Sequence, residues 1–335
     1  METRRVQITG GSSYVITLPK GWIKQLKIKK NDQLGIINKP DGTLQITSKL
    51  SREQTQTNKE FEITRRTNQT YLLRRLIGAY IAGYNYIRLK SKERMPLPIR
   101  ITTRKFTQIA IGQEVVEETD YQIIIKDLLN PSEMPFSSTI KRMHIIVKGM
   151  YVDIIRALET KDKRLIEDAI NRDNDVDRLH LLIARQHNTI LQNVSLAEKM
   201  NVSIKMSSTF FLISRIMERI GDHVVRIAQN VNILSNKKID RGVIEKIQQA
   251  SNLSLKIFNE SISSFFRKDI ESANENIEKV GELEKDCEEI NTLALKEESI
   301  TATSIGYIVG SIRRIGEYSE DISENIINFL VSEEK

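Results

Sequence analysis

The chain has 335 residues, of which 39% are hydrophobic and 28% are charged, with 51 Lys and Arg against 44 Asp and Glu. Its length suffices for a sizeable core and two or three domains, whereas its one cysteine, Cys287, excludes an intramolecular disulfide. No apolar run approaches the ~20 residues that a membrane span needs, and the N-terminus METRRVQITGG lacks an apolar signal core. We therefore expect a reduced, cytoplasmic protein with no membrane span.

The positive charge is concentrated at the start of the chain. Residues 1–50, here called the head, contain nine Lys and Arg against three Asp and Glu, so their net charge is +6. The whole-chain charge is +7, which leaves +1 for all the remaining residues. A compact basic head on a nearly neutral body favours a polyanion as the partner of the head. The alternative is a solvated basic surface that only adds solubility.

The head has the pattern of a small β unit. Apolar residues alternate with polar ones, and Gly10-Gly11 and Asp41-Gly42 provide turn signals. Between them, PKGWIKQLKIKKND predicts a short amphipathic helix that begins near Pro19. Because so few residues bury little surface by themselves, we expect a second chain to complete the unit. The alternating residues are Val6, Ile8, Tyr14, Ile16, Leu18, Leu34, Ile36, Leu44 and Ile46.

A polar stretch, SREQTQTNK at 51–59, predicts a linker. The segments that follow predict a strand at FEIT, a helix around YLLRRLIGAYIAGY, a strand at YIRLKS, a helix around RKFTQIAI, and strands at QEVVEET and YQIIIKDLL. This order indicates a small α/β subdomain in residues 60–130. The sequence does not show what the subdomain does.

From about Ser137 onward the pattern predicts long helices. We expect six of them, at 138–159, 163–192, 203–234, 241–266, 269–296 and 302–331. Two similar stretches, MERIGDHVVR and IRRIGEYSED, fall in the third and the sixth helix. Residues 137–235 and 240–335 are therefore interpreted as two copies of a three-helix bundle. The expected fold is a multidomain chain with a small β head, a short α/β region and two all-α bundles.

Acidic residues recur at a spacing of four in two neighbouring helices of the first bundle. Glu218 and Asp222 lie on one face of their helix, opposite the apolar stripe, and Gly221 leaves a gap beside them. Asp173 and Asp177 repeat this spacing in the preceding helix. Together they predict an oxygen-rich cluster of the kind that hard or borderline divalent metals prefer.

The alternative interpretation of these acids is ordinary solvated charge, paired with Arg178 or Arg219. His180 follows Asp177 by one turn, and Asp177-Arg178-Leu179-His180 is the nearest match to the Glu-x-x-His motif of di-metal carboxylate enzymes. That motif occurs once and the acids point outward, so we expect no enzyme activity.

The second bundle carries an altered copy of the acidic pattern. Arg313 replaces the first acid of the motif, while Glu317 and Asp321 form a new pair four residues apart. The sequence thus predicts a second, weaker metal site. Glu320 and Glu324 lie nearby on the same helix, and the preceding helix offers Glu278, Glu282 and Glu284 in place of the two aspartates.

RDNDVDRLHLLI and MERIGDHVVRIAQ resemble the two signature segments of PhoU, the phosphate-uptake regulator family. The resemblance implies a tandem pair of three-helix bundles whose acid-x-x-x-Asp motifs hold iron or zinc on the bundle surface. It assigns a divalent or trivalent metal to Asp173, Asp177, Glu218 and Asp222 in the first repeat. In the second repeat Glu317 and Asp321 match the motif only in part, and Arg313 departs from it.

The head, with G-S-S-x-V-I-x-L-P-K and a later K-x-D-x-L, resembles the AbrB/SpoVT/MazE swapped-hairpin domain. The resemblance implies a DNA-binding β fold in which two chains interleave, and hence a homodimer formed through the head. A PhoU domain with such a head is similar to archaeal-type regulators of phosphate uptake. We expect Arg4 and Arg5 to contact DNA, because that family reads DNA with arginines near its first strand, and Lys20 and Lys24 to hold backbone phosphates.

The leading hypothesis from the sequence is a DNA-binding transcriptional regulator of phosphate uptake, with the bundles as a metal-binding sensor or partner-binding module. The alternative is an adaptor that contacts a phosphate transporter or a sensor kinase and uses the head for dimerisation. DNA binding to the promoter of a phosphate-transport operon separates the two.

Overall fold

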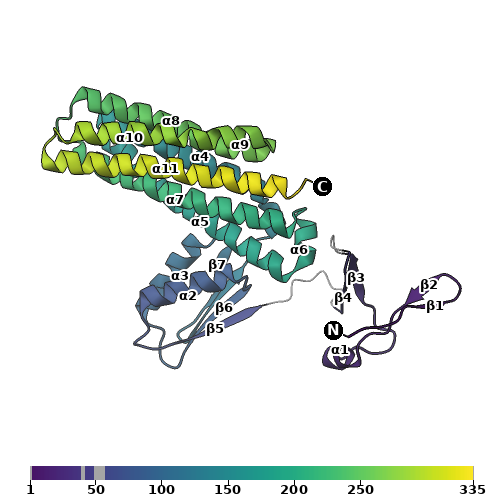
Figure 1. Cartoon of the computed structure of the whole chain (residues 1–335). Helices are drawn as coiled ribbons and strands as arrows, with labels where there is room; N and C mark the ends of the chain where they lie inside the picture. The colour runs from purple at the N-terminus through teal and green to yellow at the C-terminus, as the bar shows by residue number, and fades with distance from the viewer. Residues whose placement is uncertain (1, 39–41, 49–56, 335) are drawn as a thin grey trace. The chain divides into compact units, whose positions relative to one another are not determined.

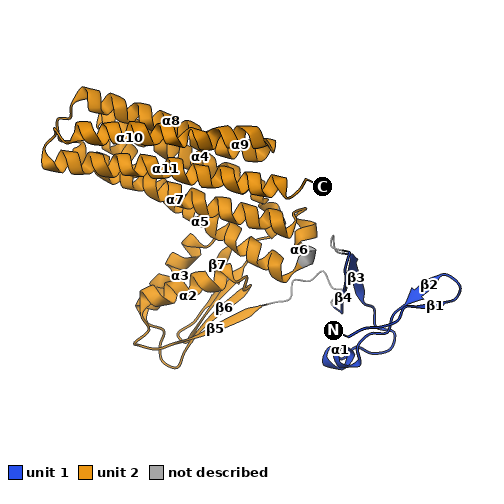
Figure 2. Ribbon diagram, viewed as in Figure 1, with its two compact units in different colours: residues 1–55 blue, residues 56–335 orange. Residues whose placement is uncertain are grey.

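The structure is a computed structural model that describes residues 2–38, 42–48 and 57–334 (Figure 1). The chain divides into two compact units, residues 1–55 and residues 56–335 (Figure 2). Residues 51–56 of the predicted linker and Asp41 of the predicted second turn lie outside the described residues. The end of the linker prediction is wrong, because residues 58 and 59 already belong to a strand.

The first unit consists of two hairpins and one short helix. Strand β1 (Gln7–Thr9) pairs antiparallel with β2 (Ser13–Val15), and β3 (Gly35–Asn38) pairs antiparallel with β4 (Leu44–Thr47). Helix α1 (Lys20–Gln25) lies between the hairpins in sequence. Gly10 and Gly11 form the first turn with φ of 64° and 83°, a conformation that favours glycine.

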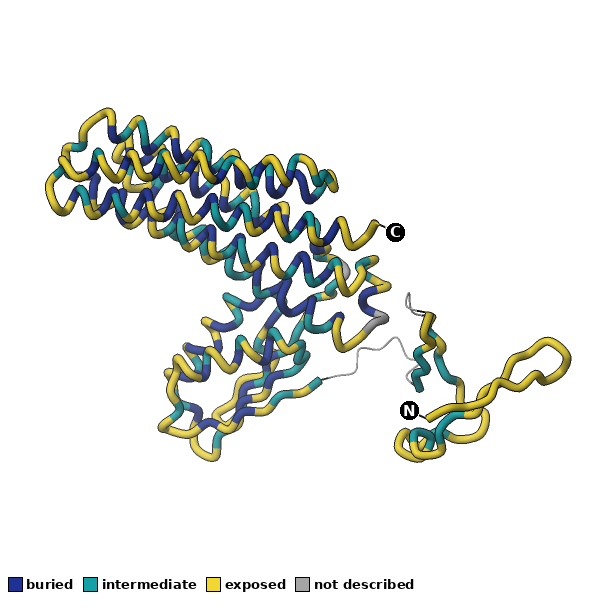
Figure 3. The backbone as a smooth tube through the Cα atoms, in the orientation of Figure 1, coloured by how far each residue is buried: buried dark blue, intermediate teal, exposed yellow. Residues whose placement is uncertain are grey.

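The described residues of the first unit form no buried core in a single chain. Among residues 2–38 and 42–48 none is buried (Figure 3). Large apolar side chains are instead exposed, including those of Tyr14 at 76%, Ile36 at 67% and Ile8 at 64%.

The second unit begins with the α/β subdomain. Its elements are β5 (Asn58–Ile63), α2 (Gln69–Ile81), β6 (Tyr86–Ser91), α3 (Leu97–Ile109), β7 (Gln113–Glu118) and β8 (Gln122–Asp127). The strands form one sheet in the order β5-β6-β8-β7, in which only β5 and β6 run parallel. Alternate strand residues, among them Phe61, Leu89 and Ile123, pack with Leu72 of α2 and Phe106 of α3 in a separate core.

The helical region contains the six predicted helices, with the fifth divided in two. They are α4 (Phe136–Thr160), α5 (Lys163–Gln192), α7 (Ile204–Leu234), α8 (Arg241–Arg267), the pair α9 (Ile270–Glu278) and α10 (Val280–Ala294), and α11 (Ser299–Val331). A short helix, α6 (Val194–Lys199), and a 3-10 turn at Pro131–Glu133 were not predicted. Within the described residues, no helix combines the length and the apolar character that crossing a membrane requires.

Side-chain caps and one shared core explain why these helices begin and pack where they do. Asp162, Ser203 and Asp240 each accept a hydrogen bond from a backbone N–H in the first turn of α5, α7 and α8. A continuous apolar core then runs through both bundles, and α7 lies against α11 at its centre (Figure 1).

Helix α5 also holds the α/β subdomain against the first bundle. The guanidinium of Arg185 forms a buried ion pair with Asp127 at 2.5 Å and donates to the carbonyl of Tyr84 at 3.0 Å. The amide of Gln186 donates to the carbonyl of Met134 at 2.8 Å. The helix that carries two of the predicted metal ligands is therefore anchored to the subdomain as well.

Candidate metal centre and nucleic-acid interface

The predicted metal ligands of the first repeat come together where α5 packs against α7. Asp173 and Asp177 lie on α5, and Glu218 and Asp222 lie on α7; these four residues are called the acidic cluster below. The two helices approach closely at Gly221, because a Cβ added there would lie 2.8 Å from Oδ1 of Asp173. A helix-interior glycine costs about 1 kcal/mol relative to alanine. Here it allows a carboxylate of the neighbouring helix to approach the backbone.

The carboxylates of the acidic cluster destabilise each other's charged forms. Burial, followed by the charges of Asp177, Asp222 and Glu218, raises the pKa of Asp173 to about 7. Burial and then Asp222 raise the pKa of Asp177 to about 6, against the opposing charge of Arg215. Burial also raises the pKa values of Glu218 and Asp222, again opposed by Arg215. The cluster therefore carries negative charge that its surroundings compensate only in part.

Two oxygen atoms of the acidic cluster have unfilled hydrogen-bonding capacity. Oδ1 of Asp173 and Oε2 of Glu218 are buried and make no hydrogen bond to any described residue. Arg215 is the cation nearest to Glu218 and lies 3.4 Å from its carboxylate. Buried polar atoms normally have a partner, so these two oxygens are candidates for a bound cation.

The donor set fits a hard or borderline metal ion in chemistry, since it consists of carboxylate oxygens. The arrangement is nevertheless open: within residues 2–38, 42–48 and 57–334, no three His, Cys, Asp or Glu side chains lie close enough together to hold a metal ion. The carboxylates would have to move towards one another on binding. A cation supplies the reason for such a movement, because it removes their mutual repulsion.

The structure corrects two details of the sequence interpretation. Glu218 does not face solvent opposite the core; its side chain is only 18% exposed, because α5 packs against that flank of α7. The arginine paired with Glu218 is Arg215, one turn earlier on α7, rather than Arg219. Arg178, the other expected partner, pairs instead with Asp175 at 3.5 Å.

His180 belongs to the packing between α5 and α7. Its Nδ1 lies 3.0 Å from Oγ of Ser214, and its ring stacks on Phe211 with 5.9 Å between centroids. Burial lowers the pKa of His180 to about 4, so the imidazole stays neutral at physiological pH. These contacts give His180 a structural role.

The second repeat has a different arrangement around the same motif. The carboxylate of Glu317 is held by Arg313 at 3.0 Å and by Arg314 at 2.6 Å. Asp321 is exposed one turn further along α11. A Cβ added at Gly316 would lie 2.3 Å from Cδ2 of Leu283. Gly316 therefore makes room for a leucine of α10, whereas Gly221 makes room for an aspartate of α5.

The acids expected to replace the two aspartates in the second repeat do not occupy equivalent places. Glu282 and Glu284 are exposed on either side of the buried Leu283. Cys287, one turn after Leu283, is buried as well, and burial raises the pKa of its thiol to about 12. The position equivalent to the acidic cluster is therefore largely apolar on the α10 side.

The basic residues predicted to bind DNA lie near the start of the head. Arg4 and Lys20 line one hollow of about 650 Å³, together with Pro19 and Trp22. Arg4 is paired with Glu2. Lys24 follows Lys20 by one turn on α1, and Arg5 is exposed. The structure thus brings Arg4 and Lys20 together, two residues that are 16 positions apart in the sequence.

Two family models match the chain. The model described as "PhoU domain" matches residues 140–231 and 247–326, which together make up about half of the chain. The model described as "Antidote-toxin recognition MazE, bacterial antitoxin" matches residues 7–54.

Similar proteins are found among curated sequences. A "Phosphate-specific transport system accessory protein PhoU homolog 1" of Thermotoga maritima is 24% identical over 196 residues, covering 57% of this chain and 83% of that protein. A "Phosphate-specific transport system accessory protein PhoU homolog" of Clostridium acetobutylicum is 19% identical over 205 residues, covering 59% of this chain and 91% of that protein.

Two solved structures share the fold of the helical region. PhoU from Pseudomonas aeruginosa gives a TM-score of 0.54 at 16% identity, covering 59% of this chain and 96% of that one. A phosphate transport system regulatory protein PhoU from Streptococcus pneumoniae gives a TM-score of 0.50 at 20% identity, covering 58% of this chain and 92% of that one.

Proposed function

The chain belongs to the PhoU domain family, and from this membership we propose that it is a DNA-binding transcriptional regulator of phosphate uptake. The observation that carries the proposal is the presence, on one chain, of two PhoU-type bundles and a basic head that matches the MazE antitoxin model. The curated relatives are named for phosphate-specific transport, which supports phosphate uptake as the regulated process. We propose no catalytic activity.

The head would bind DNA as a dimer. Its large apolar side chains are exposed in one chain, and a second copy provides the matching surface that would cover them. Arg4, Arg5, Lys20 and Lys24 would then be present twice, once in each half of the dimer. Arg4 and Arg5 precede the first strand; arginines are suited to base edges and phosphates, whereas lysines serve as charge contacts to phosphates.

The first bundle would hold a metal ion, iron or zinc, in the acidic cluster. The ion would supply the positive charge that these carboxylates lack and would engage Oδ1 of Asp173, which makes no hydrogen bond to a described residue, and Oε2 of Glu218, which has only the ion pair with Arg215 at 3.4 Å. Since α5 also carries Arg185, which anchors the α/β subdomain, occupancy of the cluster would be linked to the position of that subdomain. Glu317 and Asp321 would form a second site only after Glu317 leaves both of its arginines.

The DNA-binding part of the proposal is tested by a mobility shift with promoter DNA of a phosphate-transport operon. Arg4→Ala/Arg5→Ala is expected to weaken binding at least tenfold and to reduce the slope of log K against log salt by about 3.6, since four arginine contacts to phosphate are lost, two from each half of the dimer. A matched control is Arg65→Ala/Arg66→Ala, a second arginine pair that lies outside the head. Equal affinity and equal salt slope for the head variant and the wild type would reject the assignment.

A second candidate function is an adaptor for a phosphate transporter or a sensor kinase. The names of the curated relatives favour it, because both are called accessory proteins of a transport system. In that case the head would serve dimerisation alone. Failure to shift promoter DNA at low salt, together with co-purification of a transporter subunit, would select the adaptor over the regulator.

A further inference from the structure

The basic charge of the chain extends beyond the head. Residues 57–135, which contain the α/β subdomain, have thirteen Lys and Arg against nine Asp and Glu, a net charge of +4. Residues 136–335 have 28 Lys and Arg against 31 Asp and Glu, a net charge of −3. The α/β subdomain is therefore a second basic region, whereas the bundles are slightly acidic.

Helix α2 carries basic side chains that no carboxylate neutralises. It contains Arg74 and Arg75 and no acidic residue. Both arginines are exposed, and neither forms an ion pair with a described residue. Most arginines elsewhere in the subdomain do form such pairs, which are Arg65–Glu93, Arg88–Glu60, Arg94–Asp120, Arg100–Glu118 and Arg104–Glu118.

Aromatic rings bring a lysine of the neighbouring strand to the same surface. The guanidinium of Arg75 lies 4.4 Å from the centroid of the Phe61 ring on β5 and 5.5 Å from that of Tyr71. Nζ of Lys59, also on β5, lies 5.9 Å from the same Phe61 centroid. Strand β5 is an edge of the sheet. Lys59 and Arg75 therefore lie close together at this edge.

We call Lys59, Tyr71, Arg74 and Arg75 the α2 patch. Its charged groups are donors only, and the hydroxyl of Tyr71, whose side chain is 59% exposed, adds a further donor. The acidic residues on either side of Phe61 in β5 point to the opposite face of the strand, because strand side chains alternate. The patch thus presents positive charge and hydrogen-bond donors to a negatively charged partner.

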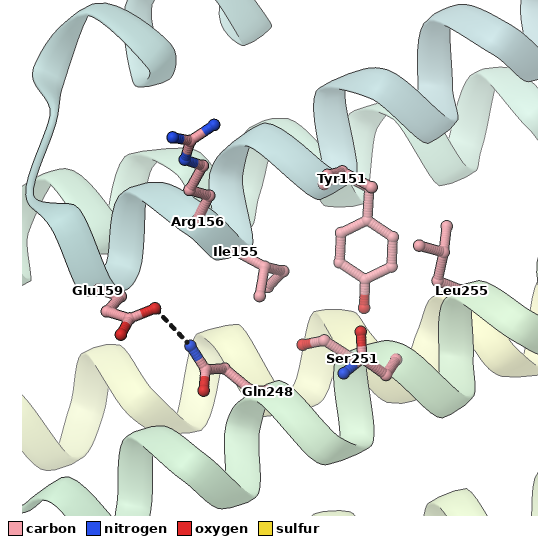
Figure 4. A pocket seen from close by; sticks show the side chains of 9 residues that line it. Tyr151, Ile155, Arg156, Glu159, Gln248, Ser251 and Leu255 are labelled. Carbon is pink, nitrogen blue, oxygen red and sulfur yellow. Dashed lines mark hydrogen bonds between the residues drawn. The ribbon is translucent and has the colours of Figure 1, made fainter.

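The hollow between the two bundles offers no such set of donors among the described residues that line it. It has a volume of about 270 Å³ and lies between α4 and α8. Figure 4 shows the guanidinium of Arg156 directed away from the hollow and the hydroxyl of Tyr151 directed towards Ser251. The α2 patch is therefore the better place for a polyanion.

We propose that the α2 patch binds the phosphate backbone of double-stranded DNA. Arginine matches a phosphate with two parallel hydrogen bonds, and lysine and tyrosine also contact phosphates. Of the four side chains only Tyr71 offers much apolar surface, whereas the centre of a protein interface is normally apolar. Such a patch adds affinity without sequence preference.

This proposal rests on the proposed DNA binding by the head. The head precedes β5 in the sequence, and Lys59 is the second residue of that strand. DNA held by the head is therefore tethered near the α2 patch, which raises its effective concentration there. The patch gives the α/β subdomain a function of its own, separate from that of the acidic cluster.

The test is a mobility shift of full-length variants over a series of salt concentrations, with the promoter DNA and with an unrelated duplex of equal length. Arg74→Ala/Arg75→Ala, the α2 variant, is expected to weaken binding of both duplexes about tenfold and to reduce the slope of log K against log salt by about 3.6, since a dimer loses four phosphate contacts. Arg94→Ala/Arg104→Ala is the matched control, because these arginines pair with carboxylates of β7 and the turn that follows it, at the other side of the sheet. The control is expected to bind as the wild type does.

Two further variants separate DNA contact from folding, since Arg75 packs on Phe61. Arg75→Lys keeps the charge and is expected to keep the salt slope. Arg74→Glu reverses the charge of an exposed side chain that pairs with no described residue. It is expected to weaken DNA binding at least tenfold with an unchanged unfolding temperature, so it decides the matter if the α2 variant does not fold.

The outcomes for the α2 patch and for the head are distinct. Wild-type affinity and salt slope in the α2 variant overturn this proposal, and the head assignment stands if Arg4→Ala/Arg5→Ala still weakens binding. An equal loss in the matched control also overturns it, because net charge alone is then the cause. A loss in the α2 variant without one in the head variant supports the patch and rejects the head assignment.

Two other results also overturn the proposal. A wild type that shifts neither duplex rejects DNA binding by the patch and by the head together. Loss of a co-purifying transporter subunit from the α2 variant, with unchanged DNA affinity, shows that the patch contacts a protein instead.

Discussion

Each bundle has a glycine at the same position of the Arg-Ile-Gly-acid motif, but the two glycines make room for side chains of different chemistry. In α7, Gly221 makes room for the carboxylate of Asp173, and in α11, Gly316 makes room for the side chain of Leu283. The motif Arg-Ile-Gly-acid is common to both helices, so the motif alone specifies a close approach of a neighbouring helix and nothing about its chemistry. The residue on that neighbouring helix decides whether the contact becomes a charged cluster or part of the core.

The same comparison extends to the charges around each glycine. In the first bundle the pKa values of all four carboxylates are raised; Arg215 opposes this rise at Asp177, Glu218 and Asp222 but not at Asp173. In the second bundle Glu317 is neutralised by Arg313 and Arg314 on its own helix. The first arrangement lacks positive charge, whereas in the second Glu317 is already paired with two arginines, and only its neighbour Asp321 has a pKa raised by burial and by Glu324 and Glu317. This difference is why the proposed metal ion is placed in the first bundle rather than in the second.

The largest expected effect comes from giving the second bundle the aspartate of the first. Leu283→Asp removes a fully buried leucine and places a carboxylate beside Gly316, where Glu317 already occupies the nearby arginines. We expect a loss of about 4 kcal/mol in the free energy of unfolding, measured by urea denaturation. Leu295→Asp is the control, because Leu295 is 81% exposed and its replacement should cost less than about 0.5 kcal/mol. Similar losses for both variants would contradict the difference between the bundles.

Metal binding is expected to produce the next largest effect, in the first bundle only. Zn²⁺ at a hundred times its Kd should stabilise the wild type by about 2.7 kcal/mol, by mass action on the folded state. Glu218→Ala/Asp222→Ala should abolish this stabilisation and also the metal that co-purifies from chelator-free preparations. The matched variant of the second bundle, Arg313→Ala/Glu317→Ala, should retain both. Equal metal content in the two variants would remove the site from the first bundle.

The helices and the acidic spacings were predictable because they depend on local periodicity. Apolar residues at steps of three and four placed five of the six long helices within three residues of their bounds. The break at Lys279 was not predicted, because no proline marks it. Tertiary contacts accompany it instead: the side chain of Asn276 is buried and donates to the carbonyl of Ile257 at 2.9 Å.

The residues that contact each site from neighbouring helices were less predictable than the spacing of the acidic residues along the sequence. The sequence placed Glu218 and Asp222 on one helix face, but which helix covers that face depends on the packing of the bundle. The roles of Arg215, Leu283 and Arg185 follow from contacts between helices and could not be read from their own neighbours in sequence. In the head, the alternation of apolar residues indicated the strands, and none of residues 2–38 and 42–48 is buried, in agreement with the expectation that so few residues bury little surface alone.

A smaller effect is expected from pH in the absence of metal. The pKa of Asp173 is raised from 3.8 to about 7, so the folded state binds its proton more tightly than the unfolded state does. This group therefore contributes least to stability at high pH: its contribution is lost as pH rises from about 4 to about 7. After allowance for solvent screening, we expect Asp173→Asn to stabilise the chelator-treated protein by about 1 kcal/mol at pH 8 and by much less at pH 5.

The pH experiment has a control on the same helix. Asp175→Asn removes a carboxylate that is paired with Arg178 and lies outside the acidic cluster. Unfolding midpoints at pH 5 and pH 8 are compared for each variant with the wild type, so that the titration of buried histidines cancels. A gain for Asp173→Asn that is the same at both pH values would show that charge repulsion is not its cause.

The smallest expected effect distinguishes the two glycines themselves. Alanine gains about 1 kcal/mol over glycine in a helix interior, so each substitution sets this gain against the contact of the new Cβ. At Gly221 the contact is with the carboxylate of Asp173 at 2.8 Å, a polar group on a half-buried side chain that can turn away. At Gly316 the contact is with Leu283 at 2.3 Å, inside a core where neither helix can easily retreat.

We therefore expect Gly221→Ala to leave the free energy of unfolding within about 0.5 kcal/mol of the wild type, and Gly316→Ala to lower it by about 1 kcal/mol. The two variants should also differ in metal binding. Gly221→Ala displaces Asp173 and should weaken the affinity for Zn²⁺, whereas Gly316→Ala should leave it unchanged. Urea denaturation and a Zn²⁺ titration of the same preparations measure both quantities. If Gly221→Ala destabilised the chain more than Gly316→Ala, the first glycine would be the more tightly packed of the two, and the carboxylate beside it would not be free to move towards a cation.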